Sequence, residues 1–100
     1  MEHEKITIKN KPVDTYVIPI NNKFNIVFIT TEKGMLACGA IDAMVLDKFN
    51  FPVVRIKSKS GTPITTVNDL LSGEVRDMNN SAAKLGITEN MTISEIISKI

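Results

Sequence analysis

The residues best suited to catalysis or ligand binding lie in one short stretch, Cys38-Gly39-Ala40-Ile41-Asp42. Apolar spacing predicts a helix from Ala40 to Phe49, directly after the cysteine. A thiol at a helix start feels the partial positive charge of the helix end, which favours the thiolate. Gly39 would let the backbone turn sharply and a ligand approach closely. Cys38 is therefore a candidate nucleophile, and Gly39 and Ala40 are candidate binding residues for a small anion.

Cys38 also has a structural interpretation. Free cysteine is among the most often buried residue types, and a small apolar side chain at a strand end is ordinary core. The only histidine, His3, lies near the first residue of the chain, so no base adjoins Cys38 in sequence. The sequence leaves open whether Cys38 is reactive or simply part of the core.

Asp42 is the second candidate catalytic residue. At about 100° per residue, Asp42 falls on the same helical face as Ile41, Val45 and Phe49, so we expect it to be at least partly buried. Asp47 falls on the opposite face and is expected to meet water. A buried carboxylate must be hydrogen-bonded or paired. Asp42 could accept free N–H groups of the helix or contact Arg55; alternatively, it could act as a general base or binding carboxylate beside Cys38.

Three basic residues, Arg55, Lys57 and Lys59, share one face at strand spacing. Such a row could bind phosphate, and Arg55 is a candidate binding residue for this reason. It could equally be a solvated face or a sheet edge that lysines protect against pairing. No aromatic residues alternate with the basic ones and tryptophan is absent, so base stacking is not supported and we expect no nucleic-acid partner.

Composition limits the remaining functions. The chain has 100 residues, 12 Lys and Arg against 11 Asp and Glu, one Cys and one His. A net charge of +1 provides no global field for nucleic acid or an anionic membrane. One Cys and one His cannot make a disulfide or a zinc site within one chain, so we predict no metal site. Dinucleotide-binding, P-loop, zinc-protease and serine-hydrolase motifs are all absent, and no cofactor is predicted.

The chain start predicts the compartment. Met1 to Lys5 is charged and leads straight into Ile6, without the apolar region of a signal peptide. No apolar run approaches the roughly 20 residues of a membrane-spanning helix, so no membrane association is expected. A lone cysteine also fits a reducing compartment, and we expect the protein to be cytoplasmic.

The elements that must position these residues begin with strands. Period-2 alternation predicts strands at residues 5–9, 16–20, 24–31 and 35–37, and a further short strand is predicted at 51–56. Pro19 removes a ladder donor, so its strand is an edge or ends there. Phe24 to Thr31 is apolar on both faces, which indicates a central strand or a face covered by another subunit.

Short helices follow. Capping pairs and apolar stripes predict helices near residues 66–71, 80–85 and 92–100. Gly73 is expected to be the left-handed residue after the first of these, and Gly86 after the second. Strands first and helices later predict one α+β domain over residues 1–100. Its mixed, mostly antiparallel sheet should have about 4–5 strands, with short helices packed mainly on one face.

One segment is similar to the signature of the YunC-like domains of unknown function. It runs from Gly34 to Asp42 and is followed by Leu46 and Asp47. Residues 66–75 (Thr-Val-Asn-Asp-Leu-Leu-Ser-Gly-Glu-Val) resemble the second block of that family. Ala82 to Ile87, followed by Met91 and Glu95, resembles its third block. The resemblance covers about Pro19 to the C-terminus. It implies a small α+β domain of bacteria and archaea, and no established activity.

Two functions fit these observations. The first is a binding or interaction module that forms a homo-oligomer, because four short helices are too few to cover both faces of the sheet. The second is an enzyme or small-anion-binding protein with its site at Cys38-Gly39 and Asp42. The sequence identifies no small-molecule or protein ligand.

Overall fold

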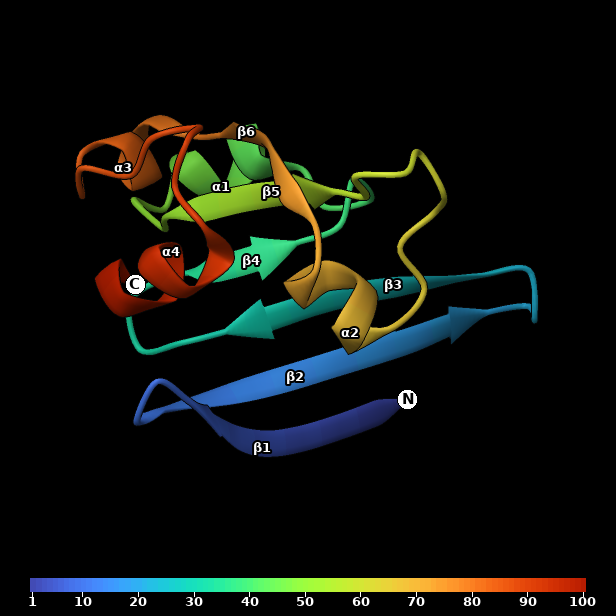
Figure 1. Ribbon diagram of the computed structural model, residues 1–100. Coiled ribbons are helices and arrows are strands. Elements are labelled where there is room, and N and C mark those ends of the chain that lie inside the picture. The colour runs from blue at the N-terminus through green and yellow to red at the C-terminus, as the bar shows by residue number, and fades with distance from the viewer.

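A computed structural model describes residues 1–100, and its central feature is one six-stranded sheet (Figure 1). The strands lie side by side in chain order, from β1 at one edge to β6 at the other. The strands are β1 (Glu2–Ile8), β2 (Lys11–Ile20), β3 (Phe24–Thr30), β4 (Met35–Ala37), β5 (Val53–Lys57) and β6 (Glu74–Met78). The prediction of a mixed, mostly antiparallel α+β fold is confirmed, because only β4 and β5 are parallel.

Tight turns join the first three strands. Lys9 and Asn10 have φ of 53° and 64°, and Asn21 and Asn22 have φ of 49° and 56°. Two successive left-handed residues match the right-handed twist of a hairpin, and asparagine tolerates that conformation well. The predicted turn after Ile20 is confirmed. Pro19 lies beyond Val17, the last β2 residue that β1 pairs with, so its missing N–H costs nothing on that side.

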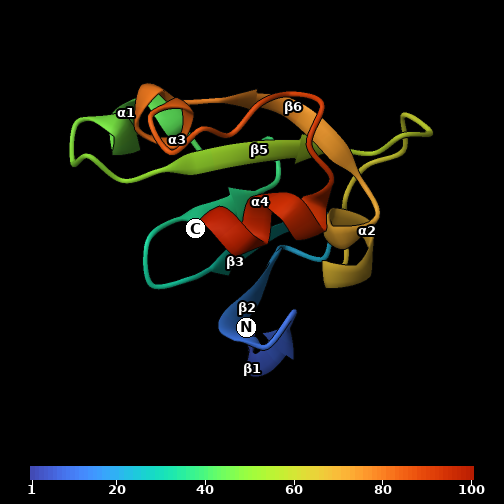
Figure 2. The same cartoon turned by 60° about the vertical axis from the view of Figure 1, so that its left-hand side comes forward.

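The helices are short and divided between the two sheet faces (Figures 1 and 2). Helices α2 and α4 lie in front of the sheet in Figure 1, and α1 lies behind β5. Helix α1 occupies the connection between the parallel strands β4 and β5. The helices are α1 (Ala43–Asp47), α2 (Val67–Leu71), α3 (Asn80–Ala83) and α4 (Ile93–Lys99).

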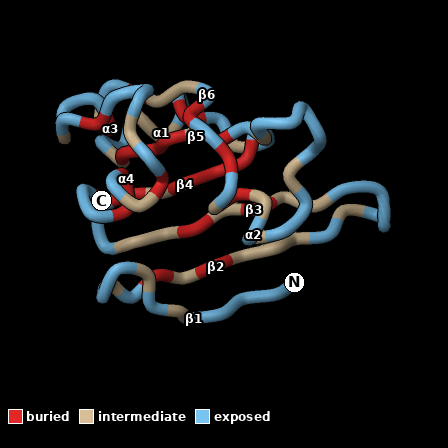
Figure 3. Tube along the Cα trace, viewed as in Figure 1, coloured by how far each residue is buried: buried red, intermediate tan, exposed pale blue.

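Two apolar clusters hold these layers together. The larger one joins the front face of the sheet to α2, α3 and α4, and includes Val27, Ile29, Leu36 and Ile96. The smaller one joins α1 to the other face through Ala37, Ala43 and Val53. Figure 3 shows burial concentrated in β4, β5 and the middle of β2 and β3, whereas β1 is exposed along most of its length.

Two predictions about the second half are wrong. The sheet has six strands rather than 4–5, because Glu74–Met78 forms β6 on the edge beside β5. Gly73 is not left-handed, since positive φ among the glycines occurs only at Gly61 and Gly86. Gly73 is instead buried against β5, where a Cβ would lie 2.5 Å from the Ile56 Cγ2 atom. Close packing, and not turn geometry, requires glycine here.

No helix of the structure has both the length and the apolar character needed to cross a membrane.

Candidate functional site

The loop between β4 and α1 carries most of the candidate residues, and its geometry differs from the prediction. The helix begins at Ala43, three residues later than expected, and Asp42 is its N-cap. The Asp42 carboxylate accepts hydrogen bonds from the backbone N–H of Met44 at 3.0 Å and of Val45 at 3.1 Å. Of the roles that the sequence left open for Asp42, acceptance of helix N–H groups is therefore the one that the structure shows. Cys38 lies four residues before this cap, so the expected position of the thiol at a helix start is wrong.

Asp42 is also exposed, which corrects the expectation of burial. The helical wheel placed it among Val45 and Phe49, but these side chains are themselves 48% and 74% exposed. Helix α1 has only five residues and contacts the sheet through Ala43 and Leu46. An apolar stripe on so short a helix does not have to define its buried face.

Cys38 is buried beside the larger apolar cluster and is only 6% exposed. Its backbone continues the β3–β4 pairing, since the Cys38 N–H donates to the Val27 carbonyl oxygen at 3.0 Å. Its Sγ atom accepts a weak hydrogen bond from the Val27 N–H at 3.5 Å. No histidine or carboxylate is among its hydrogen-bond partners. Both hydrogen bonds of Cys38 therefore join it to the neighbouring strand β3, as expected for a residue of the core.

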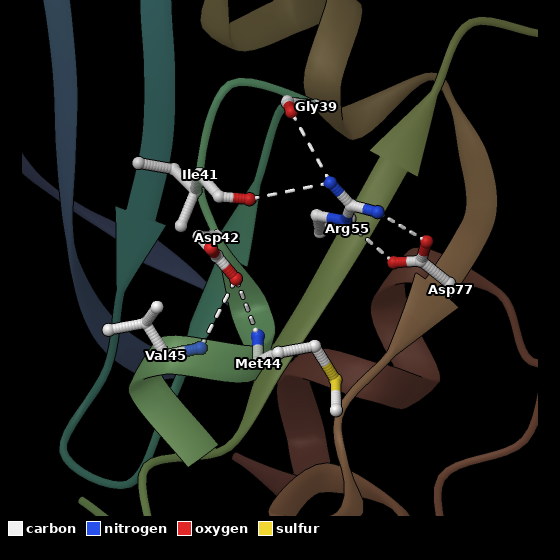
Figure 4. A network of polar contacts seen from close by, with 7 residues as sticks. All are labelled: Gly39, Ile41, Asp42, Met44, Val45, Arg55 and Asp77. Atoms are coloured by element: carbon white, nitrogen blue, oxygen red, sulfur yellow. Dashed lines mark hydrogen bonds and ion pairs between the residues drawn. The ribbon is translucent and has the colours of Figure 1, made fainter. Parts of the chain in front are cut away.

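Arg55 fixes the loop to the sheet (Figure 4). Its guanidinium donates two hydrogen bonds to Asp77 of β6, from Nε at 2.7 Å and from Nη2 at 2.5 Å. The remaining nitrogen, Nη1, donates to the carbonyl oxygens of Gly39 at 3.3 Å and Ile41 at 3.5 Å. The hydrogen bonds to Asp77 raise the pKa of Arg55, and they lower the pKa of Asp77 in return. Arg55 is thus a structural clamp rather than a free binding residue.

Two cavities flank this loop. One of about 430 Å³ is lined by Asp42, Arg55, Asp77 and Met44. The other, of about 480 Å³, also borders Gly39 and includes Cys38 in its wall. Gly39 and Ala40 border both cavities, but Cys38 and Asp42 share neither. The structure therefore does not bring the two candidate catalytic residues together.

Asn79 is a buried polar residue that the sequence analysis did not identify. It is 2% exposed. Its Oδ1 accepts from the N–H of Val53 and of Ala82, while its Nδ2 donates to the carbonyl oxygens of Ala43 and Phe51. One side chain therefore connects α1, β5 and α3. The only sequence signal was an asparagine directly before a predicted helix, which is typical of an N-cap.

Asp47 was expected to meet water, and it is partly exposed. The sequence did not predict its contact with α3, in which it accepts hydrogen bonds from the Ser81 N–H at 2.8 Å and the Ser81 hydroxyl at 2.7 Å. The hydroxyl bond is the main cause of a lowered Asp47 pKa. The contact ties α1 to α3. No group of three or more His, Cys, Asp or Glu side chains is close enough together to hold a metal ion.

Fold and site together define a small α+β domain whose central loop is held by one arginine. The model of a domain of unknown function, DUF1805, matches residues 37–100, and the chain belongs to this family. Its fold is similar to the crystal structure of TA1206, a protein of unknown function from Thermoplasma acidophilum. The TM-score is 0.83 at 23% sequence identity, over 98% of this chain and 90% of that one. No curated protein matches the chain.

Proposed function

We propose that this protein is a cytoplasmic interaction module that self-associates through the uncovered part of its sheet. We call this part the open face and define it by Tyr16, Ile18, Ile20, Phe24 and Ile26. The cross-strand pairs Ile18–Ile26 and Ile20–Phe24 place four of these side chains on the face opposite α2 and α4. None of the five packs into either apolar cluster. This separation from both clusters is the observation that carries the proposal.

Stacked rings extend the open face from Tyr16 onto both neighbouring strands, β1 and β3. The ring of Tyr16 stacks on His3 of β1 with 4.5 Å between centroids, and on Phe28 of β3 with 4.7 Å. Aromatic side chains present large contact area at a low cost in conformational entropy, which is typical of interface centres. Two further apolar side chains are exposed beyond the smaller cluster, Val45 in α1 and Phe49 in the turn that follows it.

A second copy of this chain is the occupant that the surface chemistry favours. Next to the open face, the charges are balanced: Lys5 lies 3.9 Å from Asp14, which also accepts from His3. A contact between two identical faces therefore brings no excess of like charge together. A self-complementary contact of this kind closes as a two-fold dimer.

The test is the solution mass, measured by size-exclusion chromatography with light scattering from micromolar to high micromolar concentration. We expect a mass of at least twice the 11.0 kDa of one chain. Ile26→Lys and Ile18→Lys should each shift the protein to monomer, because they place a charge at the centre of the contact. Asn68→Lys adds the same charge on exposed α2, at the opposite face, and should leave the mass unchanged. A wild-type monomer throughout this range would reject the proposal.

We also infer that the chain lies with the YunC-like members of its family. The support is the Cys38-to-Asp42 stretch and the two later sequence blocks described above. The alternative, an enzyme built on Cys38 and Asp42 together, has no support from the geometry, because the two residues border different cavities.

A further inference from the structure

The cavity beyond Gly39 has an unusual charge composition. It has a volume of about 480 Å³ and lies between the end of the sheet and the loop at residues 58–65. Two cations, Lys57 and Arg76, line it, and no aspartate or glutamate does. The whole chain is nearly neutral, so this local excess of positive charge belongs to the cavity and not to the protein at large. Low-dielectric walls around one sign of charge favour a ligand of the opposite sign.

Arg76 reaches the cavity because of a β-bulge. In the β5–β6 pairing, Arg55 faces Asp77 and Ile56 faces Val75, so the register passes over Arg76. A bulge of this kind re-aims a side chain and is common beside functional sites. Arg76 is exposed and has no ion pair, unlike Arg55.

Arg76 lies beside Gly39 at the cavity wall. A Cβ on Gly39 would lie 3.5 Å from the Arg76 Nη1 atom, and nothing else would be within 4 Å. The guanidinium therefore rests beside the bare backbone of Gly39. Arg55 also contacts Gly39, because its Nη1 donates a hydrogen bond to the Gly39 carbonyl oxygen. One arginine thus fixes the loop and the other remains free for a ligand.

Hydroxyl groups supply further donors. The side chains of Ser58, Ser60 and Thr62 form a triangle with oxygen separations of 2.9, 3.2 and 3.0 Å. Ser58 and Thr62 line the cavity, as do Asn25 and Thr65. These hydroxyls now share hydrogen bonds with one another near the surface. Rotation of each O–H would let it donate to an anion instead.

We propose that this cavity binds the phosphate group of a small organic phosphate. Arg76 offers the planar fork of donors that matches a phosphate, and Lys57 adds a second positive charge. The volume lies within the range of small-molecule sites and exceeds what a phosphate alone fills. The organic part of the ligand has apolar wall at Pro63 and Ile64. Asp42 has no part in this site.

Phenyl phosphate is a suitable probe, with binding followed by amide chemical shifts in heteronuclear NMR. We expect shifts to concentrate at Gly39, Arg76 and the loop at residues 58–65. Arg76→Gln should weaken binding by at least about tenfold, because it removes the charge and the paired donors. Lys59→Gln is the matched control: Lys59 is exposed in the same loop but does not line the cavity. It should change the dissociation constant by less than about twofold.

Several results would overturn this proposal. One is Arg76→Gln binding like the wild type while its thermal unfolding is unchanged. Equal weakening by Lys59→Gln would assign the effect to diffuse charge. Phenol serves as the uncharged probe and benzoate as the carboxylate probe; binding of either as tight as that of phenyl phosphate would exclude phosphate recognition. Apart from Phe24, no open-face residue lines the cavity, so a monomeric protein could still bind the probe.

Discussion

Arg55 and Asp77 form a paired ion contact between β5 and β6, in which two guanidinium nitrogens meet the two carboxylate oxygens at 2.7 and 2.5 Å. The pair lies directly across the register of the two strands. The third guanidinium nitrogen of Arg55, Nη1, donates to the carbonyl oxygens of Gly39 and Ile41 (Figure 4). One side chain therefore couples the edge strand β6 to the loop that separates the two cavities.

Replacing Asp77 tests the strength of this coupling. The side chains of Arg55 and Asp77 are 24% and 44% exposed, so solvent screens the pair in part. We expect Asp77→Asn to lower the free energy of unfolding by about 1 kcal/mol, measured by urea denaturation near pH 7. Glu74→Gln, at an exposed position on the same strand without an ion pair, is the control and should have little effect.

The same variant should change the pH dependence of stability. Hydrogen bonds from Arg55 lower the pKa of Asp77 in the folded protein below its usual 3.8. The stabilisation is therefore complete above pH 3.8 and is lost as the pH falls through the folded pKa. The difference between wild type and Asp77→Asn should shrink in urea titrations below that pH. A difference that grows on acidification would contradict the assignment.

Asn79→Ala should be among the most damaging single substitutions in the chain. It would remove the side-chain partner of four backbone groups, the buried contacts to Ala43, Val53 and Ala82 and the partly buried one to Phe51. We expect a loss of roughly 3 kcal/mol, seen as a lower urea midpoint. Asn90→Ala, at an exposed asparagine, should change the midpoint little. Equal effects of the two variants would show that Asn79 is not a structural hub.

Gly73→Ala tests close packing between α2 and β5. The added Cβ would lie 2.5 Å from both the Ile56 Cγ2 atom and the Lys57 carbonyl oxygen. We expect about 2 kcal/mol of destabilisation by thermal or urea unfolding, because the backbone must move apart. Gly39→Ala is the matched control, since its nearest neighbour would be at an ordinary 3.5 Å. A tolerated Gly73→Ala would contradict the tight approach.

Cys38 should behave as a core residue in alkylation by iodoacetamide. Because only 6% of it is exposed, we expect labelling of the native protein to be at least about tenfold slower than labelling of the urea-unfolded chain. Ala40→Cys in a Cys38→Ser background provides an exposed thiol two residues away and should react rapidly. Native labelling of Cys38 at that faster rate would restore it as a candidate nucleophile.

Local patterns predicted the regular elements well. Alternation located β3 and β4, capping residues located α2 and α4, and paired asparagines located a hairpin turn. Each of these signals acts over a few residues, so neighbours in the chain are sufficient to create it. The edge strand β6 was missed because its sequence, Glu-Val-Arg-Asp-Met, contains only two apolar side chains. Its pairing with β5 supplies the stability that its own pattern does not show.

The candidate site shows the same difference between local sequence signals and tertiary contacts. The sequence by itself offered acceptance of helix N–H groups as one of several roles for Asp42, because such a contact needs only a carboxylate and the next two or three backbone N–H groups; the structure shows that role. Only the tertiary structure decided that Arg55 is occupied by Asp77, that Arg76 is free at a bulge, and that Cys38 and Asp42 border different cavities. Those outcomes depend on which strands pair, and in which register, between residues 17 to 24 positions apart in the chain, and no local spacing encodes them.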